Sequence, residues 1–324
     1  MSAKQEVNFD LTVGSTGEDQ PVSWNRRDLI LYAVGIGAGP QDLEYTYEAL
    51  DQFRAFPTYP VVLGLKGDSQ DTTVFSEMVA SRSSTPGFPA LDVNTIVHGE
   101  QSIEIFRPLP LTSGEGWKLR KRISAVHDKK SALVLETEVK LISPVGAVHA
   151  IMIGSAFYRG GGQGTNFSKS IVTKPPGAIE TPKTAPTFEL SEKTTPSQAL
   201  LYRLSSDYNP LHIDPSIGER VGMGGVILHG LCSYGHAARA VLRAAEPRDG
   251  QRGSPAATLK TFSARFTSPV KPGDELCTKV WKVGEESNGL VKFAFEQNVV
   301  GGKKSLAGFA QVYEGGAPAQ PSKL

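Results

Sequence analysis

Cysteine is scarce in this sequence, and the net charge is close to zero. Only Cys232 and Cys277 occur in 324 residues. They lack the spacing of a metal site and are too few for a disulfide framework, which suits a reducing compartment. The 34 basic and 33 acidic side chains give a formal net charge of +1. The composition therefore favours neither nucleic acid nor an anionic membrane surface as a partner, and an acidic ligand must be met by a local cluster of bases.

Long apolar runs are missing as well. No segment approaches the roughly 18 consecutive apolar residues of a membrane-spanning helix. The first residues, MSAKQEVNFDLTVG, contain acids and no apolar run of signal-peptide length. We therefore expect neither a membrane span nor a secretory signal.

The last residues carry a distinctive tripeptide. The sequence ends Ser322-Lys323-Leu324 after a polar, proline-containing stretch, GGAPAQPSK. An SKL end is an address read by the peroxisomal import receptor, and it works only as an exposed extended peptide. We expect residues 316–324 to form a flexible tail, the receptor to be a partner, and the protein to reside in the peroxisomal matrix. The alternative is an accidental tail.

The middle of the chain predicts a division into two halves. Residues 159–199 are dominated by Gly, Pro, Thr and Lys and sustain no hydrophobic period, which is typical of a linker. On either side, a Phe precedes a proline-rich turn, at Phe106 and at Phe266. Alternating runs follow, LVLETEVKLI in the first half and LVKFAFEQNVV in the second, and they predict antiparallel strands. We interpret the chain as a two-fold internal duplication rather than a solenoid.

The two halves differ in their helical patterns. Residues 229–246, HGLCSYGHAARAVLRAAE, repeat apolar side chains at spacings near 3 and 4 and predict one long helix. Such a helix followed by strands that must bury one face favours a sheet wrapped around a helix. The corresponding stretch of the first half, residues 85–106, is interrupted by Gly87, Pro89 and Asn94. We expect that half to have a lost or shortened helix, which would open space inside.

A short turn in the second half gathers an acid, an amide and an imidazole. In YRLSSDYNPLHID, residues 202–214, Pro210 fixes its own backbone angle and biases Asn209 away from helix. The turn would then present Asp207, Asn209 and His212 together. An imidazole can accept a proton from water near neutral pH, a carboxylate can orient it or act as the second acid–base group, and an amide can hold the water. The alternative is a purely structural turn in which Asp207 caps a backbone N–H.

A second feature follows the turn. VILHGL places His229 and Gly230 at the start of the predicted helix, where backbone N–H groups without internal acceptors can bind an oxyanion. A glycine there lets a ligand carbonyl approach the backbone. An oxyanion site beside an acid–base pair suits chemistry on a thioester conjugated to an alkene. The alternative is that Gly230 only eases helix packing.

The stretches YRLSSDYNPLHIDP and GGVILHGLCSYG resemble the motif of type-2, R-specific enoyl-CoA hydratases. These belong to the MaoC-like family, which includes the hydratase part of peroxisomal multifunctional beta-oxidation enzymes. VHGEQSIEIFRPLP and AVHDKKSA are similar to the family's N-terminal repeat, and FSARFTSPVKPGDEL to its C-terminal repeat. The resemblance covers nearly all of residues 20–315.

The resemblance implies an α+β double hot-dog fold, in which each repeat is an antiparallel sheet wrapped around a helix and the N-terminal helix is reduced. Residues 1–158 would be a non-catalytic repeat that binds the acyl chain and CoA, and 159–199 the linker. Residues 200–315 would be the catalytic repeat. A homodimer is expected by the same resemblance.

It also implies roles for individual residues. Asp207 and His212 match the catalytic pair, Asn209 helps to hold the water, and the backbone N–H of Gly230 polarises the thioester oxygen; all four also contact substrate. The further substrate contacts that it implies are His98, Gly99, Lys129, Tyr208, Pro210, Leu211 and Phe266. A lysine beside a CoA phosphate is physically sensible. The alternatives are a solvated surface lysine at position 129 and a plain core residue at position 266.

Two stretches depart from the family pattern. Ser206 stands where the family usually has glycine, and residues 219–226, ERVGMGGV, are richer in glycine than usual. Neither departure removes a functional group. They bear on loop shape and chain-length preference rather than on the reaction.

These features predict hydration of a trans-2-enoyl-CoA to a (3R)-3-hydroxyacyl-CoA in peroxisomal fatty-acid beta-oxidation. The thioester supplies the activation, so we expect no metal and no redox cofactor, with CoA as part of the substrate. Which of Asp207 and His212 is the formal base stays open, because coupled groups share their titration. Three alternatives remain: a hot-dog thioesterase, a non-catalytic acyl-CoA carrier, and a dehydratase of a peroxisomal biosynthetic pathway. The acyl group itself is not predicted.

Overall fold

The computed structural model describes residues 7–80, 84–91, 96–246 and 256–314. The predicted import signal, Ser322-Lys323-Leu324, and the predicted tail around it lie outside the described residues. Among the helices of the described ranges, none is long and apolar enough to cross a membrane.

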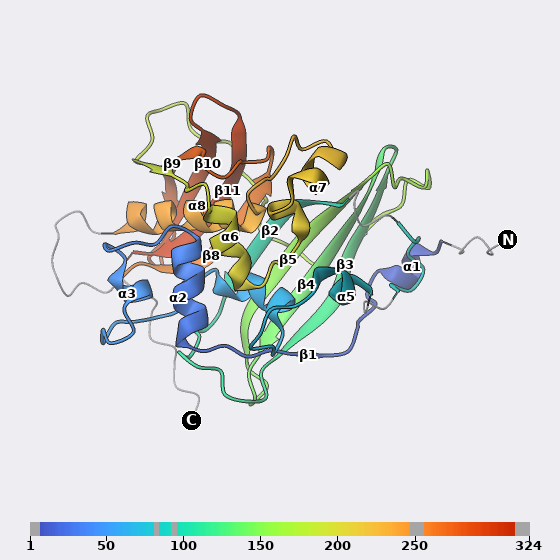
Figure 1. Ribbon diagram of the computed structural model, residues 1–324, viewed down its shortest axis with the longest axis horizontal. Coiled ribbons are helices and arrows are strands. Elements are labelled where there is room, and N and C mark those ends of the chain that lie inside the picture. The colour runs from blue at the N-terminus through green and yellow to red at the C-terminus, as the bar shows by residue number, and fades with distance from the viewer. Residues whose placement is uncertain (1–6, 81–83, 92–95, 247–255, 315–324) are drawn as a thin grey trace.

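Eleven strands of the described chain form one sheet (Figure 1). Their bounds are β1 Gln20–Pro21, β2 Ile96–Ile105, β3 Lys118–Lys129, β4 Ala132–Ile142, β5 Val148–Arg159, β6 Ser168–Ser170, β7 Phe188–Lys193, β8 Thr258–Phe266, β9 Glu275–Glu285, β10 Leu290–Val299 and β11 Lys304–Tyr313. The helices are α1 Phe9–Thr12, α2 Arg26–Gly35, α3 Leu43–Thr46, α4 Leu63–Lys66, α5 Phe75–Ala80, α6 Gln198–Tyr202, α7 Pro215–Arg220 and α8 Gly230–Ala245, with short 3-10 turns η1 Tyr59–Val62, η3 Arg203–Ser205 and η4 Pro210–His212.

The sheet order displays the internal duplication. Strands of the first half run β3-β4-β5-β2, and strands of the second continue β8-β11-β10-β9, so each half repeats the other in reverse spatial order. The halves join where β2 pairs antiparallel with β8, from Glu100 opposite Arg265 to Glu104 opposite Thr261. Alternation of apolar and polar residues gives the long strands one face for the interior, as the sequence indicated. The predicted double hot-dog fold is confirmed.

The segment between the repeats is more ordered than a linker. Residues 168–170 form β6 against β3, and residues 188–193 form β7 against β9. In β7, half-buried and exposed residues alternate, with Phe188 and Leu190 packed against the core. Lys174 binds Glu100 at 2.8 Å and also contacts Glu136, which fastens the segment to the sheet. The structure thus differs from the expected linker because a six-residue alternation and one ion-paired lysine are enough to order it.

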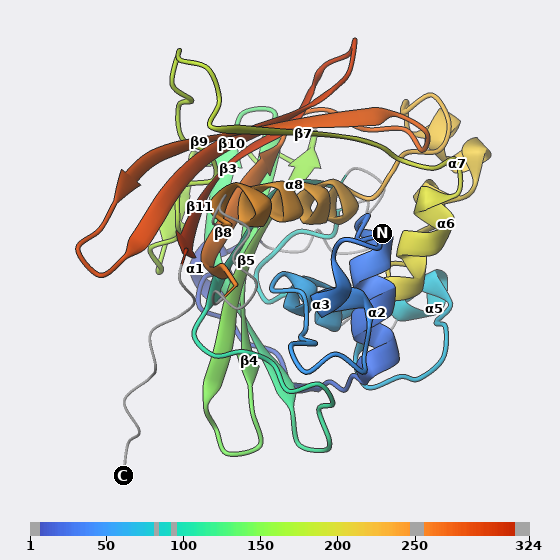
Figure 2. The same ribbon diagram turned by 90° about the vertical axis from the view of Figure 1, so that its left-hand side faces the viewer.

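The helix content distinguishes the two halves. Helix α8, with 16 residues, contacts strands β7 to β11, which wrap around it (Figure 2). In the described part of the first half, the longest helix is α2, with ten residues. It packs against α3, α6, η1 and η3 rather than lying inside the first sheet. The predicted reduction of the N-terminal central helix is therefore confirmed.

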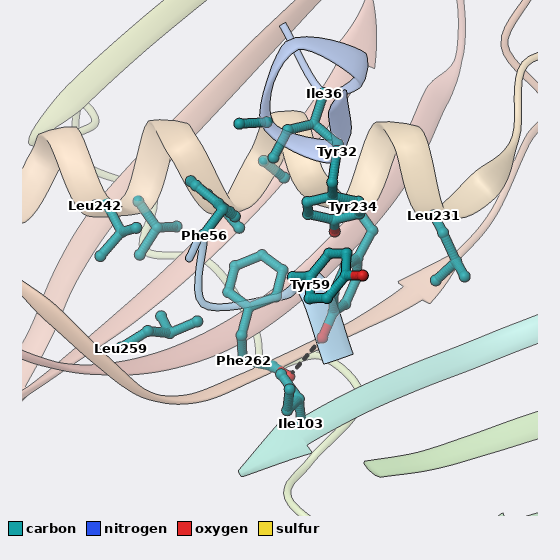
Figure 3. Close-up of a cluster of buried hydrophobic side chains, with 14 of the residues drawn as sticks. Tyr32, Ile36, Phe56, Tyr59, Ile103, Leu231, Tyr234, Leu242, Leu259 and Phe262 are labelled. Carbon is teal, nitrogen blue, oxygen red and sulfur yellow. Dashed lines mark hydrogen bonds between the residues drawn. The ribbon is translucent and has the colours of Figure 1, made fainter. Parts of the chain in front are cut away.

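One large core spans both halves. Figure 3 shows Tyr234 of α8, Phe262 of β8, Ile103 of β2 and Ile36, just after α2, in a single buried cluster. Helix α8 is also tied to the start of the chain by polar contacts. Cys232 Sγ donates to the carbonyl of Gly35, and Arg239 binds both Asp42 and Glu192 at 2.8 Å.

A second, smaller core cluster lies on the first sheet, and a less buried stretch separates it from the large core. The small cluster consists of Phe9, Phe88, Val126, Leu133 and Leu135. On β4, Leu135 belongs to the small cluster and Leu141 to the large one, and the half-buried Thr137 lies between them on the same face. Thr137 pairs with the half-buried Gly154 of β5. The inner face of the first sheet is therefore only partly buried at this row.

Candidate active site

The acid–amide–imidazole turn is built from two consecutive 3-10 turns. Turn η3 ends at Ser206, which adopts a left-handed conformation with φ 86°. That conformation favours glycine, so the family's usual residue at this position has a physical reason, and this chain retains the backbone shape with serine. Asn209 then begins η4: its side-chain oxygen accepts a hydrogen bond from the N–H of Leu211 at 3.0 Å. The amide NH₂ of Asn209 is the group left to donate to a ligand.

His212 is buried, with 8% of its surface exposed, and one of its ring nitrogens is committed. Its Nδ1 lies 2.9 Å from the carbonyl of Ile227, so Nδ1 carries the proton and donates it. Burial lowers the pKa of His212 below 6.5, although the nearby Asp207 carboxylate opposes this. His212 is therefore neutral near pH 7, with a free lone pair on Nε2.

Asp207 is half-buried and faces the same point. One carboxylate oxygen accepts a long hydrogen bond from the N–H of Asn209, at 3.4 Å. Asp207, His212 and His229 each offer a ligand atom, and these atoms all lie within 4.8 Å of one another. The turn thus contains the hydrogen bond expected of a structural turn, and it also brings a carboxylate close to an imidazole. A structural role for Asp207 therefore does not exclude a role in catalysis.

The long helix starts beside this turn. Gly230 is the first residue of α8, and the side chain of His229 before it does not cap the helix. The first N–H groups of a helix have no internal acceptor and carry the positive end of its dipole. A Cβ added to Gly230 would lie 3.4 to 3.8 Å from the ring of Phe266, which is ordinary contact. Packing therefore does not demand glycine here, and room for a ligand is the better reason for it.

The first repeat contributes His98 and its neighbour. The ring of His98, half-buried, lies 5.1 Å from the ring of Phe266 between centroids. Burial lowers the pKa of His98 below 6.5. Gly99 is the extra residue where the register of β2 shifts, and a Cβ there would come within 2.3 Å of the Phe157 ring. Gly99 therefore lets β2 bulge so that His98 reaches the second repeat.

Lys129 is not brought to this point. Its Nζ lies 5.8 Å from the centroid of the Phe157 ring. His98 pairs with Ala156 of β5, and Phe157 is the next residue of that strand. Because successive residues of a strand point to opposite faces, Phe157 and the Lys129 side chain over it lie on the other face of the sheet from His98. Its predicted contact with a CoA phosphate stays a prediction.

The remaining predicted contacts lie along the turn. Tyr208 is buried beneath the guanidinium of Arg203, which lies 5.0 Å from its ring centroid. Pro210 and Leu211 are half-buried within η4. All three are next to the cluster, so the turn as a whole can line a substrate.

His229 is the residue of this cluster to which the sequence assigned no role. Its ring stacks on His212, with centroids 3.7 Å apart and planes at 28°. Its Nε2 donates to the backbone carbonyl of Asp207 at 3.1 Å. The HG pair at the helix start was visible in the sequence, but the stacking depends on how α8 meets the turn.

Two histidines and a carboxylate could in principle hold a metal ion, so the geometry must be tested. A zinc ion needs imidazole nitrogens about 2.0–2.1 Å away, with lone pairs that converge on it. Nearly parallel stacked rings send their in-plane lone pairs side by side rather than to one point. In each ring one N–H also donates a hydrogen bond to a backbone carbonyl, so that nitrogen has no lone pair for a metal. The arrangement suits proton transfer better than metal coordination.

Comparisons with known proteins agree with this geometry. Residues 22–160 match the family described as MFE-2 hydratase 2 N-terminal domain, and residues 178–303 match the MaoC like domain. A protein of Ajellomyces capsulatus named "Probable dehydratase NIT22" is 37% identical over 81% of this chain and 69% of its own length. "Enoyl-CoA hydratase 2, peroxisomal" of Arabidopsis thaliana is 33% identical over 87% of this chain and 90% of its own.

The solved structures extend the likeness to three dimensions. A MaoC-like dehydratase from Phytophthora capsici is 36% identical, with a TM-score of 0.80 over 97% of this chain and 100% of that one. The matches together span both repeats and the segment that joins them. The chain belongs to the MaoC-like family of hydro-lyases, in the group that couples an MFE-2 hydratase 2 N-terminal domain to a MaoC-like domain.

Proposed function

We propose that the protein hydrates trans-2-enoyl-CoA thioesters to (3R)-3-hydroxyacyl-CoA. The observation that carries this proposal is that Asp207 and a neutral His212 with a free Nε2 form one cluster with His229, the residue directly before the first N–H of α8. Relatives named enoyl-CoA hydratase 2, similar over most of the chain, support it.

In the proposed reaction a water molecule lies between the Asp207 carboxylate and Nε2 of His212, with the amide NH₂ of Asn209 as a further donor. The water oxygen bonds to C3 as one of its protons passes to His212. The C2=C3 π electrons shift toward the thioester, whose oxygen accepts a hydrogen bond from the N–H of Gly230. A proton from the pair then reaches C2, so the net change is addition of one water.

For the acyl chain we propose the inner face of the first sheet, where the row through Thr137 and Gly154 separates the two core clusters. His98 leads from the cluster to this row, because its Nε2 lies 3.6 Å from the position of a Cβ on Gly154. Phe266, between His98 and Gly230, would contact the thioester end. No further cofactor enters the proposal, since CoA arrives with the substrate.

The reverse reaction is a second candidate. The relative named as a probable dehydratase is 37% identical to this chain and supports loss of water as the physiological direction. Both directions share one transition state, so the same residues serve either. A peroxisomal location is supported by relatives named as peroxisomal, and whether the pathway is degradative or biosynthetic depends on the acyl group.

The test is incubation with a chain-length series of trans-2-enoyl-CoAs, beginning with crotonyl-CoA. Loss of enoyl absorbance without release of free thiol is the expected result, and chiral analysis should give the 3R product. Release of thiol would indicate a thioesterase, and an S product would contradict the proposal. If neither hydration nor thiol release occurs, and both wild type and Asp207→Asn still bind acyl-CoA, the protein would be a carrier.

A matched glycine variant examines the oxyanion role. Gly230→Ala should fold normally, because the added methyl meets Phe266 only at ordinary contact distance. It should lower kcat about 10-fold to 100-fold by obstructing the approach of the thioester oxygen to the N–H. An unchanged kcat would remove Gly230 from the mechanism.

A further inference from the structure

His229 holds a position that the proposed chemistry does not use. It is 1% exposed and lies at the junction between the catalytic turn and α8. Its ring packs between His212, with centroids 3.7 Å apart, and Tyr202, at 4.9 Å. A buried imidazole between two other rings is held in one orientation by packing alone.

The polar edge of the same ring fixes the carboxylate-bearing residue. Nε2 of His229 lies 3.1 Å from the carbonyl oxygen of Asp207, and a carbonyl can only accept, so the nitrogen carries the proton. That bond holds the main chain of Asp207 rather than its side chain. Loss of the bond would leave a partly buried carbonyl unpaired and the turn free to shift.

The face of the ring restrains the imidazole. Among the described residues the His212 ring has one hydrogen bond, from Nδ1 to the carbonyl of Ile227, which sets a pivot for the ring. Stacking on His229 removes rotation about that pivot. The His212 ring is then held in one place beside Asp207, whose carboxylate lies within 4.8 Å of a nitrogen of that ring.

The backbone of His229 also leads directly into Gly230, the first residue of α8. One residue therefore touches the carboxylate-bearing turn, the proton-accepting ring and the start of the oxyanion helix. We propose that His229 is the positioning residue of the active site, a single imidazole that sets Asp207, His212 and the Gly230 N–H in register. This inference rests on the function proposed above and deepens it.

The charge state of His229 agrees with this role. Burial lowers its pKa well below 6.5, and the neighbouring His212 lowers it further. A neutral ring with a protonated Nε2 keeps its bond to the Asp207 carbonyl and adds no charge beside His212. Among the described residues its Nδ1 has no hydrogen-bond partner, which is consistent with a ring held by stacking and one bond.

Two substitutions separate the two contacts. His229→Gln keeps a nitrogen donor near the place of Nε2 but loses the ring, whereas His229→Phe keeps a ring and loses the donor. Each should lower kcat about 10-fold to 100-fold with KM changed less than about 3-fold, because a shift of about 1 Å in a catalytic group has that effect. His229→Ala, which loses both, should be slower than either.

A control variant comes from the same helix. His236 is as buried as His229, at 3%, but it pairs with Glu192 away from the turn. His236→Gln should keep the wild-type kcat at temperatures where it is folded. Equal losses of kcat in the His229 and His236 variants, scaling with melting temperature, would overturn the proposal and make His229 a core residue.

A readout independent of catalysis completes the test. The chain has six histidines, so ¹⁵N-histidine labelling gives a spectrum simple enough to assign by substitution. The wild-type His212 ring should show a protonated Nδ1 and a bare Nε2, and His229→Ala should show averaging of the two nitrogens. An unchanged His212 ring in His229→Ala would overturn the proposal. If wild type hydrates no enoyl-CoA, the function fails while the spectra still decide the positioning role.

Discussion

The two repeats share one strand arrangement, and the proposed reaction assigns them different tasks. Strands β2 to β5 correspond to β8 to β11 in order and pairing, yet only the second set wraps a long helix. The first repeat in its place has a bulge at Gly99 and an inner face split between two core clusters. In the proposed reaction the second repeat has a helix end to stabilise charge, and the first has room for the acyl chain. A duplicated fold can therefore separate the reacting groups from the space for the ligand.

Replacing one histidine of each repeat by alanine should give the largest contrast in kinetics. His212→Ala should lower kcat about 1,000-fold, since it removes the proton acceptor of the proposed reaction. His98→Ala should change kcat little and raise KM by up to about 10-fold, since His98 would only line the substrate path. Steady-state kinetics with crotonyl-CoA measure both. A larger kcat loss in His98→Ala would reverse the assignment of the repeats.

Alanine at one glycine of each repeat probes packing in the same way. On Gly235 of α8 a Cβ would lie 2.3 Å from Ile36, and on Gly99 it would lie 2.3 Å from Phe157. Gly235→Ala should lower the free energy of unfolding by about 1–3 kcal/mol without changing KM of the folded enzyme. Gly99→Ala should move the bulge that presents His98 and raise KM.

Urea unfolding and kinetics together measure both effects. Phe157→Leu should restore KM in the Gly99→Ala background, because it frees the space that the new methyl requires. If Gly99→Ala is silent in KM and the double variant is no different, the bulge does not set the position of His98.

Acidification should lower the free energy of unfolding through one histidine in each repeat. His98 and His212 have folded-state pKa values below 6.5, lowered mainly by burial. Unfolded histidines bind protons near pH 6.5, so the unfolded chain takes up more protons below that pH and the free energy of unfolding falls as pH drops. The acid limb of log kcat/KM should also have its midpoint below pH 6.5.

The histidine variants assign these two effects. Thermal unfolding from about pH 8 to pH 5 should show a smaller loss of stability in His98→Asn than in wild type. The acid limb of kcat/KM should stay in place in that variant, because His212 is the group that must remain neutral. A limb that moves with His98 would place the titrating group in the first repeat.

The smallest expected effect lies at Ser206, in the second repeat alone. Serine with φ 86° is strained, and glycine tolerates that conformation. Ser206→Gly should raise the free energy of unfolding by about 0.5–1 kcal/mol and leave kcat within about 2-fold. A loss of stability would mean that the serine side chain contributes more than the backbone strain removes.

The sequence predicted the features that local patterns determine. Alternating runs identified the strands, the spacing in residues 229–246 identified α8, and Pro210 placed the turn. The glycine and proline interruptions before β2 correctly indicated that the central helix of the first half is reduced. These signals are local, and each is read from a stretch about as long as one element.

Tertiary placement accounts for what the sequence did not predict. Strand β7 was hidden in a segment rich in Thr and Pro, and its alternation is meaningful only beside β9. Lys129 falls on the face opposite His98 because a bulge displaces the register of β2 at Gly99. The stacking of His229 on His212 depends on where α8 starts relative to the turn. None of these follows from spacing along the chain.

Contacts between α8 and the start of the chain prevent the two repeats from being separated without loss of stability. Arg239, 3% exposed, is held by Asp42 from one side of the duplication and by Glu192 from the other. Gln198 likewise donates to the carbonyl of Gly35. A cut between the repeats would leave a buried guanidinium short of one carboxylate, which is strongly destabilising. We therefore expect neither repeat to be stable alone, so a fusion protein designed to carry the proposed activity has to contain both.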